Sequence, residues 1–241
     1  MAAVPVDVDN HPEELPRMLA EGQLDAVILV GAFVDRTINQ LLQRPGKPVV
    51  LIDAYALDAS YDAVVSDNFR GAYQAVSHLV AAGHRHIGVV GTLPDAYPSI
   101  AERRRGYEQA LRDHAIEERY FADAHIMHEE VAEATAMLLQ RFPQVTALFC
   151  ANDMVALDAL AAARGLGRQL PEQLSVVGFD DIETAAHVTP ALTTMRVDKG
   201  AMGRLAVQLL LHRAEAPGSS PVTAVIRPTL VERQSVAQVK I

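Results

Sequence analysis

Two polar residues, Asn152 and Asp180, each follow a run of apolar residues that is typical of a buried parallel strand. The first run is Val145–Phe149 and the second is Leu174–Gly178. In an open α/β sheet, ligands bind in the crevice outside the carboxyl ends of the strands. Asparagine both donates and accepts hydrogen bonds, whereas an aspartate only accepts them. The spacing therefore predicts a polar ligand-binding rim that contains both side chains.

A purely structural role is the alternative for these two residues. Asparagine and aspartate are common helix caps, and Asn152-Asp153 stands directly before a predicted helix from about Met154 to Arg164, which Gly165 ends. We favour the ligand-binding interpretation because Asn152 and Asp180 both fall at strand ends that face the same edge of the sheet.

The sequence shows no assembled catalytic set and no cofactor-binding motif. It contains no phosphate loop, and Gly165-Leu166-Gly167 follows a helix and lacks the third glycine of a dinucleotide fingerprint. His84-Arg85-His86 has no cysteine or acid cluster nearby, whereas a zinc site needs three or four ligands, so a structural role is favoured. We therefore expect no cofactor, no metal and no enzymatic activity.

Composition favours an acidic, soluble ligand-binding protein. The net charge of −9 over 241 residues opposes binding to nucleic acid, which needs a positive surface. The single cysteine, Cys150, ends a buried strand and is expected to be an inert core thiol. No apolar run approaches the ~20 residues that span a bilayer, and the N-terminus lacks the features of a secretory signal. We expect a cytoplasmic location.

Strand and helix patterns alternate along most of the chain, with few hairpin signals, which predicts a doubly wound α/β fold. The linker 216–221 is the segment richest in turn residues. The predicted strands include Val4–Val8, Leu24–Val30, Pro48–Ile52, Ala63–Val65, His86–Gly91, Leu192–Met195, Val222–Ile226 and Thr229–Glu232. The predicted helices include Asn68–Ala82, Arg103–His114, Glu129–Gln140 and Lys199–His212.

Several motifs, taken in order, resemble the effector-binding domain of the lactose/galactose repressor (LacI/GalR) family. They are Asp67-Asn68 with Gly71-Ala72, His78-Leu79 with Gly83-His84 and Ile87, the element Arg103 to Tyr107, CANDMVALDAL from Cys150, LPEQLSVVGFDDI from Leu170, and PALTT from Pro190. The matches run from about Leu24 to Glu232, so the resemblance covers most of the chain. No single motif is diagnostic, but their order and spacing together are specific.

The resemblance implies an α/β fold with two doubly wound parallel-sheet lobes, of the type I periplasmic-binding-protein-like class. Three segments would cross between the lobes, and a ligand would lie in the cleft between them. On that pattern the crossings fall near Thr92, Met195 and Pro221. The first lobe is then residues 1–92 plus 196–221, and the second lobe is residues 93–195 plus 222–241.

The resemblance also implies which residues contact the effector, typically a sugar or a purine. Arg103, Asn152 and Asp180 match family positions that hydrogen-bond it, although Arg103 could instead be a surface residue. Tyr97 and Ser99 fall where relatives often place further contacts. The family often takes an aromatic platform from the segment that is Ala124–His128 here, which lacks Trp, Tyr and Phe. This departure argues against a stacked pyranose, although His128 could partly substitute.

A family member of this kind is a small-molecule sensor, the effector-binding and dimerisation core of a transcriptional regulator. We expect a homodimer, with Asn68–Ala82 and Ala185–Val188 as candidate contributors, and no membrane partner. Operator DNA would be contacted only through an N-terminal head, which is expected to be missing before Val4. The first strand and helix of the first lobe are expected to be missing as well. The alternatives are a solute receptor for sugar transport, which should carry an export signal, and an enzyme, which should carry a catalytic set.

Overall fold

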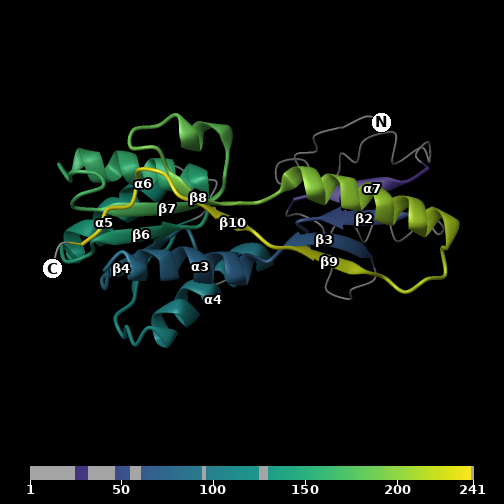
Figure 1. Cartoon of the computed structure of the whole chain (residues 1–241), viewed down its shortest axis with the longest axis horizontal. Helices are drawn as coiled ribbons and strands as arrows, with labels where there is room; N and C mark the ends of the chain where they lie inside the picture. The colour runs from purple at the N-terminus through teal and green to yellow at the C-terminus, as the bar shows by residue number, and fades with distance from the viewer. Residues whose placement is uncertain (1–24, 32–46, 55–60, 94–95, 125–129, 240–241) are drawn as a thin grey trace. The chain divides into compact units, whose positions relative to one another are not determined.

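The computed structural model describes residues 25–31, 47–54, 61–93, 96–124 and 130–239 (Figure 1). The chain divides into two compact units. Unit 1 is Met1–Val65 with Asp198–Ile226, and unit 2 is Ser66–Val197 with Arg227–Ile241. The predicted strand Val4–Val8 lies outside the described residues. No helix in the described part of the chain is both long and apolar enough to cross a bilayer.

Unit 1 contains a four-stranded sheet in the order β1-β2-β3-β9. Its strands are β1 (Val27–Val30), β2 (Val49–Ile52), β3 (Asp62–Ser66) and β9 (Thr223–Ile226), and α7 (Lys199–Glu215) is its helix within the described residues. β2 pairs in parallel with both β1 and β3. Apolar residues of the first three strands pack into one cluster that includes Val49, Leu51 and Val65. The predicted Pro48–Ile52 and Ala63–Val65 strands are thus confirmed.

A buried ion pair fastens the end of α7 to the sheet of unit 1. The Arg213 guanidinium donates to both carboxylate oxygens of Asp62, from Nε at 2.8 Å and from Nη2 at 2.9 Å. It also donates to the carbonyl oxygens of Ser219 and Ser220 in the turn-rich linker. Burial alone would raise the pKa of Asp62, but the hydrogen bonds from Arg213 and from the Val222 N–H hold it below its usual value. The linker is therefore anchored by charge.

Unit 2 contains a six-stranded sheet in the order β10-β8-β7-β6-β4-β5. The strands are β4 (Ile87–Val90), β5 (Tyr120–Ala122), β6 (Ala147–Cys150), β7 (Ser175–Asp180), β8 (Thr193–Arg196) and β10 (Thr229–Val231). All neighbours pair in parallel except β10, which is antiparallel to β8. This order is the doubly wound arrangement that the alternating pattern predicted.

Helices cover both faces of this sheet (Figure 1). The helices α3 (Asn68–Ala81) and α4 (Pro98–Asp113) pack on one face, and α5 (Glu130–Arg141) and α6 (Asp153–Gly165) pack on the other. Successive residues of a strand point to opposite faces. Accordingly, Ala147 and Phe149 of β6 join the core beneath α3 and α4, while Leu148 and Cys150 join the core beneath α5 and α6. Cys150 is fully buried, as expected of a core thiol.

The close contact between α3 and α4 depends on Gly106. A Cβ atom at this position would lie 2.9 Å from the Cβ of Ala72 and 3.0 Å from the backbone nitrogen of Tyr73, and closer still to the carbonyl oxygen of Phe69. Real Cβ atoms essentially never approach other heavy atoms so closely. The absence of a side chain at Gly106 therefore allows α4 to approach α3 this closely.

The division of the chain differs from the predicted crossings in two places. Residues 66–92 belong to unit 2, although the sequence prediction assigned them to the first lobe, because β4 is hydrogen-bonded between β5 and β6. Residues 222–226 belong to unit 1, because β9 lies beside β3 in its sheet. The middle boundary, after Val197, lies two residues beyond the predicted Met195.

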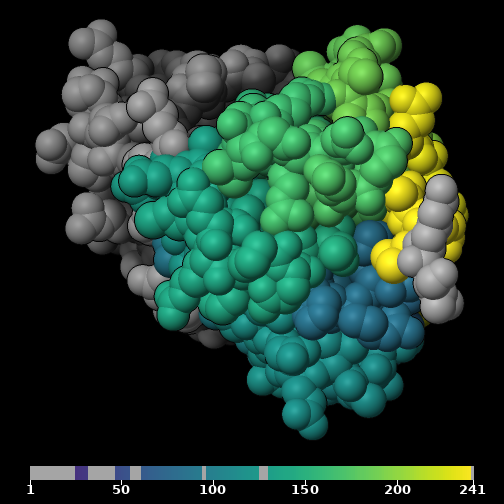
Figure 2. All heavy atoms as spheres, turned by 90° about the vertical axis from the view of Figure 1, so that its left-hand side faces the viewer, coloured from purple at the N-terminus to yellow at the C-terminus, as the bar shows by residue number. Residues whose placement is uncertain are grey.

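The C-terminal segment is bound along unit 2 and is drawn in yellow in Figure 2. Ser235 accepts a hydrogen bond from the Thr193 N–H, and the Val239 N–H donates to the carbonyl oxygen of Ala82. The buried His84 ring bridges Thr146 Oγ1 and the Ala237 carbonyl oxygen. His84 therefore has the structural role that the sequence favoured. No cluster of three metal-ligating side chains occurs within the described ranges.

Candidate functional site

The guanidinium of Arg103 joins three elements at the carboxyl end of the unit 2 sheet. Arg103 is a residue of α4 and is only 3% exposed. Its Nε donates to Asn68 Oδ1 at the start of α3 at 2.9 Å, and its Nη1 donates to the Ala151 carbonyl oxygen after β6 at 2.6 Å. Its Nη2 donates to Asp180 Oδ1 at the end of β7 at 3.2 Å. The structure thus brings Arg103 and Asp180 into contact, and Arg103 is buried, not a surface residue.

Two further residues, which the sequence analysis did not name as site residues, stabilise this buried cation. Asn68 is itself fully buried, and its Nδ2 donates to the Ser66 carbonyl oxygen at 3.0 Å, which fixes its Oδ1 toward Arg103. The Phe179 ring lies 3.8 Å from the guanidinium carbon, measured to the ring centroid. A cation over an aromatic face is stabilised by the ring quadrupole. Phe179 is a fully buried core residue, and its ring also lies against the Arg103 guanidinium.

Asp180 is the partly exposed acceptor of the cluster. It ends β7, and its side chain is 29% exposed while that of Arg103 is 4% exposed. A buried charge must be paired and hydrogen-bonded to be tolerated. The Arg103 guanidinium is hydrogen-bonded to Asn68, to the Ala151 carbonyl oxygen and to Asp180. A polar ligand at this rim would therefore meet the Asp180 carboxylate, with Arg103 holding that carboxylate in place.

Asn152 caps α6 and lies next to the cluster in the chain. Its Oδ1 accepts a hydrogen bond from the Val155 N–H at 2.8 Å, so the capping interpretation is correct for this atom. The residue before it, Ala151, supplies the carbonyl oxygen that Arg103 contacts. The cap occupies the acceptor of the amide, so Nδ2 is the atom through which Asn152 would contact a ligand.

Tyr97 and Ser99 lie at the start of α4, on the helix that carries Arg103. Tyr97 is the N-cap of α4, and Ser99 precedes Arg103 by four residues, a spacing that places two residues on one helix face. Both side chains are half-buried. None of the hydrogen bonds found in the described ranges joins Ser99 to Arg103, Asn152 or Asp180, so the structure places Ser99 near this cluster only by helix spacing.

A second buried carboxylate, Asp153, lies behind the rim and was not identified as a site residue from sequence. Asp153 is fully buried. It accepts hydrogen bonds from Thr194 Oγ1 at 2.5 Å and from the Ile182 N–H at 2.8 Å. The contacts tie the start of α6 to β8 and to the turn that follows Asp180. Burial raises the pKa of Asp153 to about 6, and the negative charges of Asp180 and Asp181 act in the same direction.

Replacement of Asp153 by asparagine is expected to change how stability depends on pH. Native Asp153 binds its proton more tightly than the unfolded chain, whose ordinary pKa is 3.8, so its contribution to stability is present below about pH 4 and lost as pH rises through about 6. The unfolding free energy of the wild type should therefore fall by roughly 2–3 kcal/mol relative to Asp153→Asn between about pH 4 and pH 7.

The measurement is urea unfolding of both proteins at several pH values. An asparagine can accept from the Ile182 N–H and donate to Thr194, so the variant keeps both contacts. His84, whose pKa burial lowers, gives the opposite slope, but it contributes equally to both proteins and cancels in the difference. If the difference in unfolding free energy between the two proteins did not change between about pH 4 and pH 7, this result would contradict a raised pKa at Asp153.

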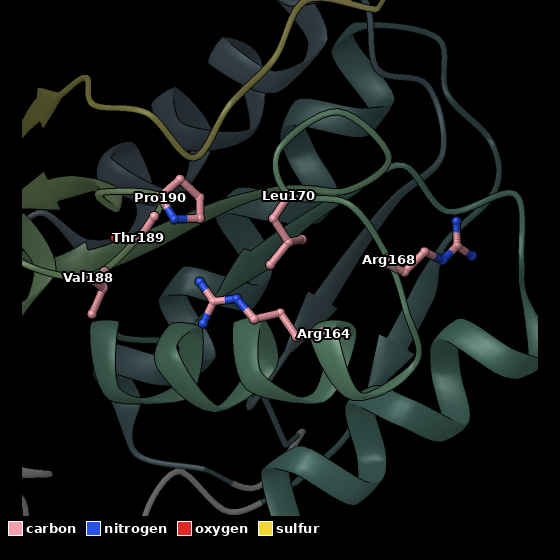
Figure 3. A pocket seen from close by; sticks show the side chains of 6 residues that line it. All are labelled: Arg164, Arg168, Leu170, Val188, Thr189 and Pro190. Carbon is pink, nitrogen blue, oxygen red and sulfur yellow. The ribbon is translucent and has the colours of Figure 1, made fainter.

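A shallow hollow elsewhere on unit 2 does not coincide with this rim (Figure 3). Its lining residues are Arg164, Arg168, Leu170, Val188, Thr189 and Pro190. Arg164 is in the last turn of α6, where the helix dipole favours a cation, and Arg168 donates to the Pro143 carbonyl oxygen at 2.9 Å. Both arginines thus have structural explanations. The hollow lies at the carboxyl end of α6, whereas Asn152 caps its amino end.

Comparisons with known proteins identify relatives over most of the chain. A family model described as "Periplasmic binding protein-like domain" matches residues 76–236. The ribose operon repressor of Haemophilus influenzae is 34% identical over 197 residues, which are 80% of this chain and 58% of that protein. The transcriptional repressor PurR of Klebsiella pneumoniae is 30% identical over 235 residues, which are 95% of this chain and 69% of that protein. The chain thus spans less than two thirds of the ribose repressor.

Solved structures of regulators share the fold. A complex of the transcriptional regulator CelR with cellobiose has a TM-score of 0.81 at 31% identity, over 91% of this chain and 68% of that one. A LacI family regulator from Enterococcus faecium with bound ribose has a TM-score of 0.83 at 26% identity, over 93% of this chain and 83% of that one. Together with the family model and the repressor relatives, these matches show that the chain belongs to the periplasmic binding protein-like domain family, as an effector-binding domain of the LacI type.

Proposed function

We propose that this chain is the small-molecule effector-binding core of a LacI-type transcriptional regulator. The observation that carries the proposal is the buried Arg103, which holds the partly exposed Asp180 carboxylate at the carboxyl end of the unit 2 strands. That edge is where open α/β sheets bind ligands. The relatives support the regulatory role, since both repressors and structural neighbours are transcriptional regulators.

The ligand that suits this rim carries hydroxyl or N–H donors. Asp180 offers acceptors, and the Asn152 Nδ2 offers a donor that would meet a ring oxygen or ring nitrogen. We propose Arg103, Asn152 and Asp180 as the principal effector-binding residues, with Tyr97 and Ser99 as further contacts. A sugar or a purine base fits this chemistry. Ribose and cellobiose, which two structural neighbours hold, are the first probes to use.

The remaining parts of the proposal concern the parent regulator. We propose that effector binding biases the arrangement of the chain's two units, and thereby an N-terminal head that contacts operator DNA in the cytoplasm. We also propose a homodimer. Within α3, Phe69, Arg70 and Gln74 are exposed, and Phe69 is 37% exposed, so this part of the helix can contact a second copy.

Replacement of Asp180 by asparagine tests the binding site. Removing a charged acceptor costs about 1.5–3 kcal/mol of hydrogen-bond energy, so affinity for the effector should fall by roughly tenfold to a hundredfold. The measurement is isothermal titration calorimetry of ribose, cellobiose, adenine and hypoxanthine against both proteins. Asp113→Asn, at the opposite end of α4, is the matched control and should bind as the wild type does. Equal affinities of wild type and Asp180→Asn for the bound probe would reject the proposed role.

A further inference from the structure

The turn that follows β7 has an unusual backbone at two consecutive residues. Asp180 has a φ of 103° and Asp181 has a φ of 51°, and neither is glycine. Positive φ is uncommon for residues with a side chain, although aspartate is among those that tolerate it best. Such conformations persist only where the surrounding structure holds them. The turn that presents Asp180 at the rim must therefore be held by its neighbours.

The contacts that hold the turn converge on Asp181. Its Oδ2 accepts from Arg196 Nε at 2.6 Å, and its Oδ1 accepts from Arg233 Nη2 at 2.6 Å. The side chains of Asp181 and Arg233 are 9% and 16% exposed, so water screens their ion pair weakly, whereas Arg196 is 54% exposed and its pair with Asp181 is screened more strongly. Burial alone would raise the pKa of Asp181, but the two arginines lower it, which keeps the carboxylate charged.

Arg196 lies next to the residue where the chain leaves unit 2, and Arg233 follows β10, the first strand after the chain returns. Arg196 ends β8, and the chain enters unit 1 after Val197. The chain returns to unit 2 at Arg227, forms β10 and reaches Arg233 two residues later. Arg196 is paired in register with Asp180 on one side and with Thr229 of β10 on the other. A single carboxylate thus ties the turn to both connecting segments.

We propose that Asp181 is a positioning residue that sets the place of the Asp180 carboxylate and transmits its displacement to the ends of β8 and β10. The inference rests on the proposed function only in that Asp180 is taken to meet the effector. A ligand that displaces Asp180 also displaces the turn that contains Asp181. The Asp181 carboxylate is hydrogen-bonded to the guanidinium groups of Arg196 and Arg233. Those groups belong to Arg196, at the end of the strand that precedes unit 1 in the chain, and to Arg233, just after the strand that follows it.

The test uses nuclear magnetic resonance of the whole 241-residue chain, which needs no known ligand. Asp181→Asn tolerates positive φ but cannot hold two cations. Asp180 should then lose its fixed position, and the guanidinium protons of Arg103 should shift and exchange at least about tenfold faster. The Arg196→Met/Arg233→Met double variant keeps Asp181 but removes its partners, and it should show the same signature.

The control is Glu108→Gln, which removes a carboxylate that pairs with Arg104 and Arg112 on the same helix as Arg103. It should leave the Arg103 signals unchanged. Unchanged Arg103 signals in Asp181→Asn would overturn the positioning role, and a shift there that the double variant fails to reproduce would overturn the role of the two arginines.

Titration of the four probes into Asp181→Asn separates this inference from the proposed function. Affinity for the probe that the wild type binds should fall by about tenfold, because Asp180 no longer holds its place. If the wild type bound none of the probes, this result would count against the effector role of Asp180. Altered Arg103 signals in Asp181→Asn would still support the positioning role of Asp181. Unchanged affinity alongside altered signals would overturn the link from Asp181 to the ligand.

Discussion

Replacement of Arg103 by methionine is expected to lower the free energy of unfolding of unit 2 by about 3 kcal/mol, since removal of one partner from a buried network leaves the others unpaired. Methionine keeps an apolar stem over Phe179 but donates nothing. Asn68 Oδ1 and the Ala151 carbonyl oxygen would lose their donor, and the Asp180 carboxylate would lose its cation. Urea unfolding followed by circular dichroism measures the loss.

Arg105, two residues along α4 from Arg103, provides a matched control for this substitution. Arg105 is on the same helix, but its side chain is 66% exposed and its ion pair with Glu102 is 3.6 Å long. Exposed ion pairs contribute little, so Arg105→Met should change stability by less than about 0.5 kcal/mol. If Arg103→Met were as harmless as Arg105→Met, the buried network could not be what holds the rim together.

Replacement of Gly106 by alanine is expected to cost about 2–3 kcal/mol, near the upper end of overpacking effects. The new methyl group would meet the backbone of α3 at Phe69 and Tyr73 and the Cβ of Ala72. Backbone atoms cannot rotate aside as a long side chain can, so α4 would have to move away from α3. Because Arg103 is on α4 and Asn68 is on α3, effector affinity should fall with stability.

Gly165, the last residue of α6 on the other face of the sheet, offers the corresponding control. A Cβ atom there meets nothing within 4 Å, and its φ lies outside the range that disfavours side chains. Alanine favours helix over glycine, so Gly165→Ala should leave stability unchanged or raise it by up to about 1 kcal/mol. Thermal unfolding of both variants compares them directly. A Gly106→Ala protein as stable as Gly165→Ala would show that the two helices are not in tight contact.

Local sequence patterns were sufficient to predict most elements of unit 2. The predicted helix from Met154 to Arg164 corresponds to α6, Asp153–Gly165, and the strand Val145–Phe149 corresponds to β6, Ala147–Cys150. Apolar runs and caps report the conformation of adjacent residues, which is why they succeed. Asn152 and Asp180 follow or end two neighbouring parallel strands, β6 and β7, and so lie at the same edge of the sheet, as predicted.

The contacts that build the site could not be predicted in the same way. Asn68 and Arg103 are 35 residues apart, and Asp153 and Thr194 are 41 residues apart, so no local pattern pairs them. The first crossing was misplaced at Thr92 for a related reason. The alternation of strands and helices continues without a linker signal through Val65 and Ser66, and only the order of strands in the sheet shows that β4 belongs to unit 2.

The central claim is that a small polar ligand binds at the rim formed by Arg103, Asn152 and Asp180. Its most direct test is nuclear magnetic resonance of the labelled chain during titration with ribose, cellobiose, adenine and hypoxanthine. The account predicts that one probe shifts the signals of these three residues at saturable concentrations, and that Asp180→Asn abolishes or weakens the response. If the probes instead shifted the signals of residues that line the hollow, such as Arg164 and Pro190, and left those of the rim unchanged, the central claim would be contradicted.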